Sequence, residues 1–267
     1  MQFNAGHAIV RDMSSRPTTP AEAFEIVNPD GDHAVILVCD HASNFVPSEY
    51  GTLGLPLSEF SRHIAYDIGA ADVTRALAAS LNAPAVMARF SRLVIDANRG
   101  SDDPTLVMKL SDGSIIPGNA GADAAEIERR IARFHRPYHQ AITAWIDEAV
   151  SRKIVPALIS VHSFTPAWKG RKRPWHYGVL WDKDGRIATP LLARLRQETG
   201  IAVGDNEPYS GELENDSMNR HGTRRGLPHV LIEIRQDLIE SELKAQAVAS
   251  FLTGVLQEVL KSPKIRA

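Results

Sequence analysis

Two histidines in this chain stand at the ends of apolar runs, each beside other polar residues. His41 follows the run Ala34–Asp40, and His162 lies in the run Pro156–Phe164. Neutral imidazole is a good zinc ligand, and a catalytic zinc site commonly has three protein ligands and leaves a fourth position open. The pair therefore predicts a zinc site, while each histidine taken alone is also consistent with a hydrogen-bonded structural residue.

The third ligand of such a site is commonly a carboxylate. Asn44 stands three residues after His41, where a His-x-x-Glu pair has its acid, but an amide is a poor zinc ligand. Asp67 is the better candidate, because helical spacing places it on the apolar stripe of a helix expected over Leu57–Leu81. A carboxylate facing a core is costly unless it is paired or binds a cation. Asp67 is thus expected to bind the metal, with a buried ion pair or a helix-cap contact as the alternative.

Two further acids lie close to these candidates in the sequence. Asp40 directly precedes His41, and Asp96 follows the apolar residues Leu93–Ile95. Both are rivals of Asp67 as ligands. Each is more simply interpreted as a partner that orients a ligand histidine or an arginine.

Glu233 and Arg235 close another apolar run and predict the proton chemistry of a hydrolase. Glu233 is the expected general base, which takes a proton from a zinc-bound water and gives it to the leaving nitrogen. Arg235, two residues on, would point to the same side of a strand and orient Glu233 or hold charge in the transition state. Arg99, with Asn98 beside it, suits bidentate recognition of a substrate carboxylate, although pairing with a local aspartate explains it too.

Other polar residues are candidates for substrate contact. Arg173 and Tyr209 could complete a pocket for an acidic substrate, and the Tyr138 hydroxyl could lie near it. His135 and His139 are one helical turn apart, which leaves open a second metal pair, but buried structural roles explain them more simply.

The elements that must position these residues alternate along the chain. Apolar runs predict strands over 34–40, 85–90, 93–97, 156–164, 177–181, 203–210 and 229–234. Helical periodicity predicts helices over 57–81, 123–152, 187–198 and 241–260, the second divided near Arg133 by Pro137. This order predicts an α/β fold with a mostly parallel sheet and helices on both faces. Ligands bind such sheets beyond the carboxyl ends of the strands, where the polar residues stand.

Composition fits one enzyme domain over residues 24–267 after a loosely ordered segment 1–23. Hydrophobic residues make up 43% and charged residues 23%, and the net charge of −2 argues against a nucleic acid as the main partner. A single cysteine and a start unlike a signal peptide suit the cytoplasm, and no apolar run reaches the roughly 18 residues of a membrane span. A monomer or a small homo-oligomer is expected.

The motifs together resemble the N-formylglutamate amidohydrolase family, over roughly residues 24–240. The resemblance is carried by His41–Ala–Ser–Asn44, Ile95–Asp–Ala–Asn98–Arg99, Ser160–Val–His162–Ser163 and Glu233–Ile–Arg235, and also by Ser114–Asn119 and Tyr138–His139. The family is similar to zinc carboxypeptidases and to the succinylglutamate desuccinylase and aspartoacylase group. Here the chain departs from the His-x-x-Glu pattern, and Ala65–Tyr66–Asp67 matches the family only at its acid.

The resemblance implies a fold, a cofactor and residue roles. The fold would be a three-layer α/β sandwich of the phosphorylase/hydrolase type, with a mixed, mostly parallel sheet and one zinc ion. His41 and His162 would be the histidine ligands, Glu233 the catalytic glutamate, and Asn98–Arg99 the pair that binds the substrate carboxylate. Asn119, in the matching stretch 114–119, is added to the substrate-binding candidates.

The leading hypothesis is a zinc-dependent amide hydrolase that removes a formyl-like acyl group from a small N-acyl acidic amino acid such as N-formylglutamate. A zinc peptidase or an amidase for cell-wall fragments is the first alternative, to be distinguished by an open cleft rather than a closed pocket. A ligand-binding protein without activity on the same fold is the second.

Overall fold

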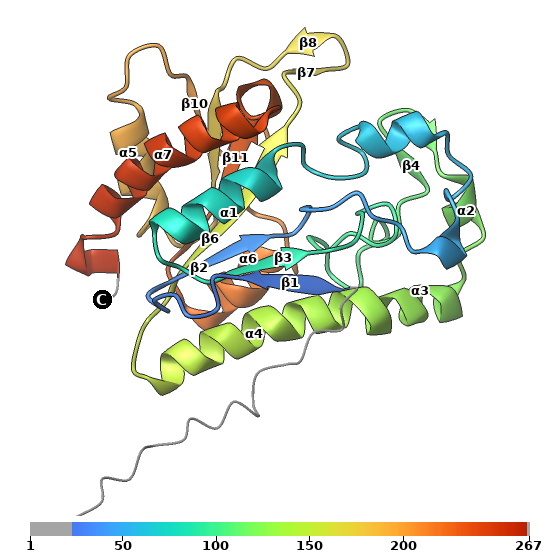
Figure 1. The fold of residues 1–267 in the computed structure, drawn as a ribbon, viewed down its shortest axis with the longest axis horizontal. Helices are drawn as coiled ribbons and strands as arrows, with labels where there is room; N and C mark the ends of the chain where they lie inside the picture. Colours follow the sequence, from blue (N-terminus) through green and yellow to red (C-terminus); the bar gives the residue numbers. More distant parts are fainter. Residues whose placement is uncertain (1–22, 266–267) are drawn as a thin grey trace, which may run out of the picture.

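The computed structural model describes residues 23–265, which form a seven-stranded mixed sheet between two layers of helices (Figure 1). The strand order is β1-β3-β2-β6-β11-β9-β10. The strands are β1 Phe24–Val27, β2 Val35–Cys39, β3 Ala85–Ala88, β6 Ala157–Phe164, β9 Tyr177–Leu180, β10 Val203–Asp205 and β11 His229–Arg235. The predicted segment 1–23 lies outside the described residues, except for Ala23.

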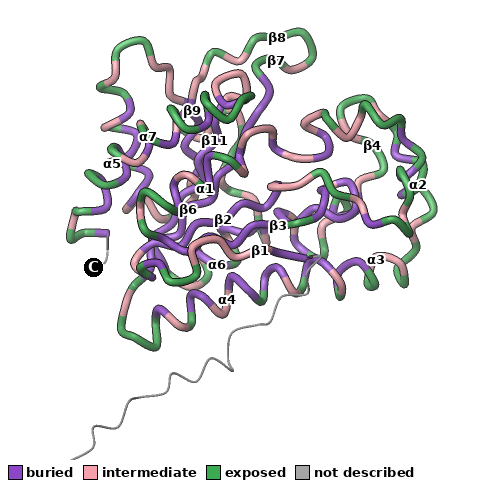
Figure 2. The backbone as a smooth tube through the Cα atoms, in the orientation of Figure 1, coloured by how far each residue is buried: buried purple, intermediate pink, exposed green. Residues whose placement is uncertain are grey.

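The centre of the sheet is parallel and its margins are mixed. β2 pairs in parallel with β3 and β6, β6 pairs in parallel with β11, and β10 pairs in parallel with β9. The antiparallel pairs are β1 with β3 and β9 with β11. Every residue of β2, β3, β6 and β9 is buried, as expected for strands covered on both faces (Figure 2). The predicted mixed, mostly parallel sheet is confirmed.

Helices cover both faces of the sheet, which gives the expected three layers (Figure 1). On one face, α1 Ala70–Ser80, α5 Ala188–Leu195 and α7 Glu242–Val259 pack on one apolar cluster. On the other, α4 Arg136–Ser151 packs on a second apolar cluster, to which α6 Ser217–His221 contributes Met218. Smaller elements are α2 Pro117–Ala120, α3 Ala124–Arg130 and the hairpins β4 Leu110–Ser111 with β5 Ser114–Ile115 and β7 Ala167–Trp168 with β8 Arg171–Lys172.

The helix predicted over 123–152 is present and is divided where proline requires it. α3 continues into a π-helical turn, Ile131–His135, and α4 then begins with Pro137 in its first turn. Proline has no N–H to donate, so it is tolerated at a helix start and not in its interior. The His135 and His139 side chains, on either side of this proline, are both buried.

The helix predicted over 57–81 is wrong in its first half. Leu57–Ser61 is a short 3-10 helix, and the chain then turns before α1 begins at Ala70. Gly69 has a φ of +77°, and a Cβ there would lie 2.1 Å from the Ile239 carbonyl oxygen. The backbone therefore leaves helical geometry at Gly69, and Asp67 lies on the preceding turn rather than on a helix.

The strand predicted over 93–97 is also wrong. Side chains, rather than a neighbouring strand, supply the hydrogen bonds of this backbone segment. Asn119 Nδ2 donates to the Leu93 carbonyl at 2.8 Å, and an Arg130 guanidinium nitrogen donates to the Val94 carbonyl at 2.8 Å. These contacts satisfy buried backbone groups of an apolar segment that folds as consecutive turns. The strand predicted over 203–210 is limited to β10, and β1 was not predicted.

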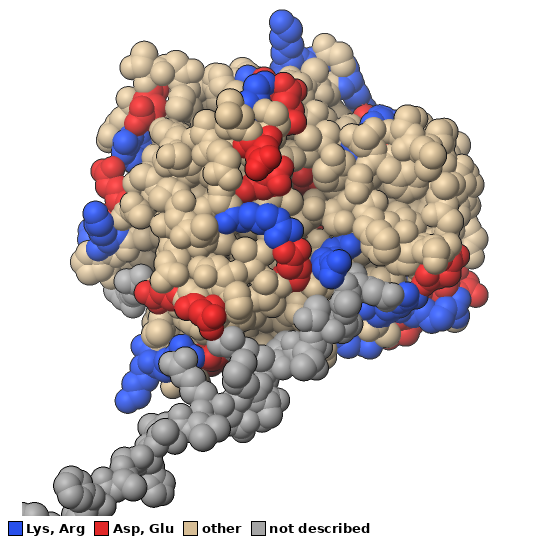
Figure 3. Space-filling view, viewed as in Figure 1, with Lys and Arg blue, Asp and Glu red and all other residues tan. Residues whose placement is uncertain are grey.

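The surface and the helices agree with the composition. Basic and acidic side chains are interspersed on the face shown in Figure 3, as the small net charge suggests. Within residues 23–265, no helix is both long and apolar enough to cross a membrane.

Candidate metal centre

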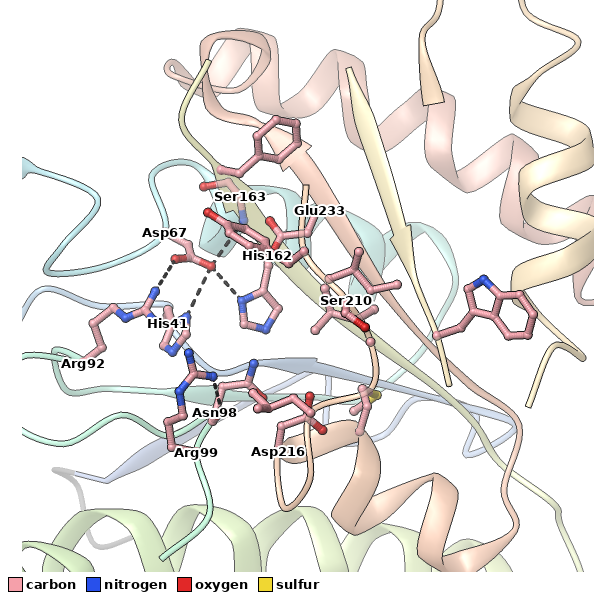
Figure 4. A pocket seen from close by; sticks show the side chains of 18 of the residues that line it. His41, Asp67, Arg92, Asn98, Arg99, His162, Ser163, Ser210, Asp216 and Glu233 are labelled. Carbon is pink, nitrogen blue, oxygen red and sulfur yellow. Dashed lines mark hydrogen bonds and ion pairs between the residues drawn. The ribbon is translucent and has the colours of Figure 1, made fainter. Parts of the chain in front are cut away.

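A cavity of about 220 Å³ opens where β6 and β11 end and where the chain leaves β2 and β3. Seven of the predicted site residues line it: His41, Asp67, Asn98, Arg99, His162, Tyr209 and Glu233. They come from segments far apart in the sequence and meet beyond the carboxyl ends of the parallel strands (Figure 4). This is the place that ligands occupy in sheets of this kind.

His41, Asp67 and His162 form a buried group, named here the metal-ligand cluster. Asp67 Oδ2 lies 3.4 Å from His41 Nδ1 and 2.8 Å from His162 Nδ1 (Figure 4). One donor atom from each residue can be chosen so that all three lie within 4.8 Å of one another. Ligands of a tetrahedral zinc with bonds of about 2.0–2.1 Å stand roughly 3.3 Å apart, so the three donors fit such an ion.

The turn before α1 aims Asp67 at the histidines. The Asp67 amide donates to the His41 carbonyl at 2.9 Å, and the Ser163 amide points at Asp67 Oδ2 at 3.3 Å. These backbone contacts tie the carboxylate to the ends of β2 and β6. Asp67 therefore reaches the site predicted for it, although the expected helix does not carry it there.

The other ring nitrogen of each histidine also faces a carboxylate. Asp96 Oδ1 lies 2.6 Å from His41 Nε2, and Asp40 Oδ2 lies 3.0 Å from His162 Nε2. A carboxylate that accepts a hydrogen bond from the Nε2–H group leaves the Nδ1 lone pair free for a metal and makes the ring a stronger ligand. The sequence-based interpretation of Asp40 and Asp96 as orienting partners agrees with this geometry.

Arg92 joins the two acids on the His41 side and was not predicted. One guanidinium nitrogen donates to Asp96 Oδ2 at 2.8 Å and another lies 3.5 Å from Asp67 Oδ1. With neutral histidines, the three buried aspartates and this arginine carry a charge of −3 + 1 = −2. A divalent cation would balance that charge, so both the donor set and the electrostatics fit a metal ion.

Electrostatics around His162 show how strongly the site attracts positive charge. Burial alone would lower the pKa of this histidine, but hydrogen bonds to Asp40 and Asp67 and their negative charges raise it well above its usual range. A proton on His162 and a metal ion compete for the same lone pair. The surroundings of His162 therefore favour a cation of either kind.

Glu233 lies beside His162 in the register of β11 and β6, and so faces the same cavity. Burial raises the pKa of its carboxyl to about 7, and the Oε2 atom is buried without a hydrogen-bond partner. The register partner of Glu233 on β9, the other neighbouring strand, is Gly178. A Cβ at that position would lie 2.3 Å from the Glu207 carbonyl oxygen. A carboxyl with a free oxygen and a pKa near neutrality can exchange protons with a reactant in the cavity.

Asn98 and Arg99 lie on the loop that crosses the mouth of the sheet. Asn98 Oδ1 accepts a hydrogen bond from the Ser217 amide at 3.0 Å, which ties this loop to α6. Arg99 lines the cavity, its Nη1 donates to the Asn98 carbonyl at 3.0 Å, and its Nε lies 3.8 Å from Asp103, so its charge is only loosely paired (Figure 4). Arg99 is available to bind an anionic group of a ligand.

Four predicted site residues lie outside the cavity lining, and each contacts other groups in this structure. Arg235 pairs with Asp237 and the carbonyls of residues 173–175 instead of reaching Glu233, because its guanidinium turns along the strand end. The Asn119 side-chain amide donates to the carbonyls of Leu93 and Met108 and so fixes the backbone there. Tyr138 donates to Asp40 Oδ1 at 3.0 Å from within the core.

Arg173 is the fourth of these residues. It contacts Tyr209, which lines the cavity, but does not line the cavity itself. It donates to the Tyr209 hydroxyl at 3.1 Å and stacks over the Tyr209 ring at 5.0 Å. Tyr209 itself lines the cavity, as predicted. Arg173 therefore positions a residue of the cavity wall in this structure. Other lining residues, among them Arg92, Asp182, Asp216 and Met218, were not predicted, since none of these four belongs to a motif.

A second histidine cluster, His135, His139 and His221, is buried on the α4 side of the sheet. His139 Nδ1 lies 2.9 Å from His221 Nε2, and His139 Nε2 lies 3.0 Å from the Ala97 carbonyl. His135 Nε2 lies 2.8 Å from the Arg99 carbonyl. These nitrogens meet carbonyls and one another rather than carboxylates, so the cluster holds the backbone on both sides of Asn98.

The chain resembles known sequences over most of its length. A sequence model described as N-formylglutamate amidohydrolase matches residues 33–240. An N-formylglutamate deformylase of Pseudomonas putida is 24% identical over an aligned length of 201 residues, and the match covers 69% of this chain and 74% of that protein.

Solved structures share the fold. A gene product of Agrobacterium tumefaciens is 37% identical, with a TM-score of 0.86 over 91% of this chain and 97% of that one. The N-formylglutamate amidohydrolase of Ralstonia eutropha is 22% identical, with a TM-score of 0.68 over 90% of this chain and 97% of that one. The likeness extends over nearly all of the described residues.

Proposed function

The chain belongs to the N-formylglutamate amidohydrolase family, and on that premise we propose that it is a zinc-dependent hydrolase of the amide bond in a small N-acyl amino acid. The observation that carries the proposal is the metal-ligand cluster with the free Glu233 oxygen beside it in one cavity. The names of the relatives suggest N-formyl-L-glutamate as the first substrate to test. A small cavity suits such a molecule.

His41, Asp67 and His162 would hold the zinc ion, with Asp96 and Asp40 fixing the two imidazoles from behind. When bound, zinc polarises the acyl carbonyl and lowers the pKa of water. Glu233 would take the proton from the attacking water and deliver it to the leaving nitrogen. Its pKa near 7 suits both directions of transfer.

Arg99 would bind the substrate carboxylate as a bidentate partner, and Asn98 would help to place it. The hydrogen bond between Ser217 and Asn98 and the two histidine contacts to the carbonyls of Ala97 and Arg99 keep this loop in place. A fixed carboxylate sets the distance between the amide bond and the zinc ligands.

The cavity volume bears on the peptidase alternative. About 220 Å³ is below the roughly 300–1,000 Å³ of pockets for drug-sized ligands, and suits a single amino-acid derivative. The alternative of a ligand-binding protein is disfavoured by the buried Oε2 atom of Glu233, which lacks a partner. Leaving such an atom unpaired is costly, and proton transfer gives it a use. The cytoplasm and a monomer or small homo-oligomer remain the expected setting.

The test is Glu233→Gln, measured with N-formyl-L-glutamate and related N-formyl amino acids. We expect kcat to fall by about 10²–10⁴-fold, the usual contribution of a general base, while bound zinc stays near one ion per chain. Glu128→Gln on the exposed surface of α3 is the matched control and should keep full activity. Unchanged turnover in Glu233→Gln, together with a protein that binds no zinc, would refute the mechanism.

A further inference from the structure

The cavity has an apolar end next to Glu233. Leu231 precedes Glu233 by two residues on β11, so the two side chains share one face of the sheet. Leu180 is the register partner of Leu231 on β9 and lies on the same face. Met218 from α6 belongs to the same apolar cluster as Leu180 and Leu231, and Leu213 from the loop before α6 also lines the cavity. The apolar subsite is defined here as Leu180, Leu213, Met218 and Leu231.

The apolar subsite also adjoins the residues that would hold the substrate carboxylate. Met218 directly follows Ser217, whose amide donates to Asn98 Oδ1 at 3.0 Å. A substrate whose carboxylate meets Arg99 and whose amide nitrogen lies near Glu233 has its Cα between these two groups. We infer that its side chain then extends toward the wall between α6 and β11, where the apolar subsite lies.

Charges at this end do not suit a second carboxylate on the substrate. Arg92 and Arg99 are the arginines among the described lining residues, which include no lysine, and Arg92 is already paired with Asp96 and Asp67. Asp216, adjacent to Ser217, is an acid at this end (Figure 4). Burial raises the pKa of Asp216 to about 6, so even its own charge is poorly compensated. A glutamate side chain placed here would add another uncompensated carboxylate.

The other candidate cations near the cavity are His63, His229 and Arg173, and they do not change this conclusion. His63 Nε2 lies 3.3 Å from Asp112 Oδ2. His229 lines the cavity near Leu231, but its ring nitrogens already meet the Leu227 carbonyl at 2.8 Å and the Thr223 hydroxyl at 3.0 Å. Arg173 bonds Thr165, just beyond the end of β6. Thr165 follows Ser160, the partner of Leu231, by five residues, which is about 16 Å at roughly 3.3 Å per residue. Arg173 thus lies at the opposite end of the cavity from the apolar subsite.

We propose that the apolar subsite binds the side chain of the substrate, and that the enzyme prefers N-acyl derivatives of aliphatic amino acids over those of glutamate. The inference rests on the proposed amide hydrolysis and specifies the amino acid on which it acts. N-formyl-L-leucine and N-formyl-L-methionine are the probes that match the size and character of the subsite. Their kcat/KM should exceed that of N-formyl-L-glutamate by about 10-fold or more, the effect of one or two buried methylenes and a removed charge.

A charge introduced into the subsite should reverse this order. Leu213→Arg, at a half-buried loop position, should lower kcat/KM for the leucine derivative and raise it for the glutamate derivative, each by about 10-fold. Leu243→Arg, at a leucine of α7 that is 84% exposed, is the matched control and should leave the ratio unchanged. A wild type that prefers glutamate, with a ratio insensitive to Leu213→Arg, would overturn the inference.

Binding to Glu233→Gln separates this inference from the proposed function. Titration calorimetry with the three N-formyl amino acids measures affinity in a protein impaired in the proposed chemistry. Tighter binding of the leucine and methionine derivatives supports the apolar subsite even if the wild type hydrolyses none of them, a result that would refute only the hydrolase proposal. Tighter binding of the glutamate derivative, or equal binding of all three, overturns the subsite and leaves the hydrolase proposal standing.

Discussion

The molecule holds two buried groups of histidines with opposite electrostatic surroundings. In the metal-ligand cluster, His41 and His162 face Asp40, Asp67 and Asp96 through all four ring nitrogens. In the second histidine cluster, the contacts that His139 makes are to His135, His221 and the Ala97 carbonyl. Both clusters contain buried histidines, but their ring nitrogens contact carboxylates in the first and other histidines and backbone carbonyls in the second.

The pKa values follow the partners. Carboxylates overcome burial and raise the pKa of His162, whereas burial and the neighbouring histidines lower the pKa of His139 well below its usual value. A group of histidines therefore attracts a cation when acids surround it and stays neutral when carbonyls do. The helical spacing of His135 and His139, which left a second metal pair open, fits a backbone clamp instead.

Asp67→Asn is the strongest test of this comparison. Loss of the ligand carboxylate should remove bound zinc and lower kcat by about 10³-fold or more, since the zinc contribution is several kcal/mol. His139→Gln is the matched change in the second cluster and should keep about one zinc per chain. Metal content by plasma mass spectrometry and kcat are the measurements. Zinc retained in Asp67→Asn, or lost from His139→Gln, would contradict the distinction between the clusters.

Asp40→Asn probes the acid behind the ligand His162 and should have a smaller effect. Zinc affinity should fall by about 10–100-fold, because an amide fixes and polarises the imidazole less well than a carboxylate. Tyr138→Phe removes one hydrogen bond to Asp40 and should fall between this variant and the wild type. Competition with a chelator gives the affinities, with Asp147→Asn on the surface as control. Equal affinities in Asp40→Asn and the control would show that Asp40 is only structural.

The fold was predictable wherever local pattern and burial agree. β6 and α4 follow from an apolar run and from helical spacing interrupted by a proline. The segment 93–97 has the apolar composition of a strand, but Asn119 and Arg130 supply its hydrogen bonds from elsewhere in the chain. Such long-range side-chain contacts leave no local trace in the sequence.

The candidate site was predictable where residues stand in motifs. His41, His162 and Glu233 come together in one cavity because strand ends meet at one edge of a parallel sheet. Asp67 was selected for the cost of burying an acid, and that cost is real even though the helix expected to carry it is absent. Arg92 was missed because its turn resembles an exposed connection, and only the fold shows the two aspartates that it joins.

His221→Gln tests the second cluster through the pH dependence of stability, the smallest of these effects. Burial lowers the pKa of His221 to about 3 in the folded protein. Below the usual pKa of about 6.5, this histidine is therefore protonated in the unfolded chain and stays neutral in the folded protein. Its contribution to stability is therefore complete above pH 6.5 and is lost progressively as the pH falls toward 3. Between pH 7 and pH 5, the wild type should lose about 2 kcal/mol more than His221→Gln, since the slope approaches roughly 1.36 kcal/mol per pH unit below pH 6.5. Urea unfolding at pH 7 and pH 5 measures this change in the free energy of unfolding for each protein. The contribution of the metal-ligand cluster is the same in both proteins and cancels when the two changes are subtracted. Parallel stability curves for the two proteins would mean that His221 already shares a proton in the folded state, and the contrast between the two clusters would then be one of geometry rather than charge.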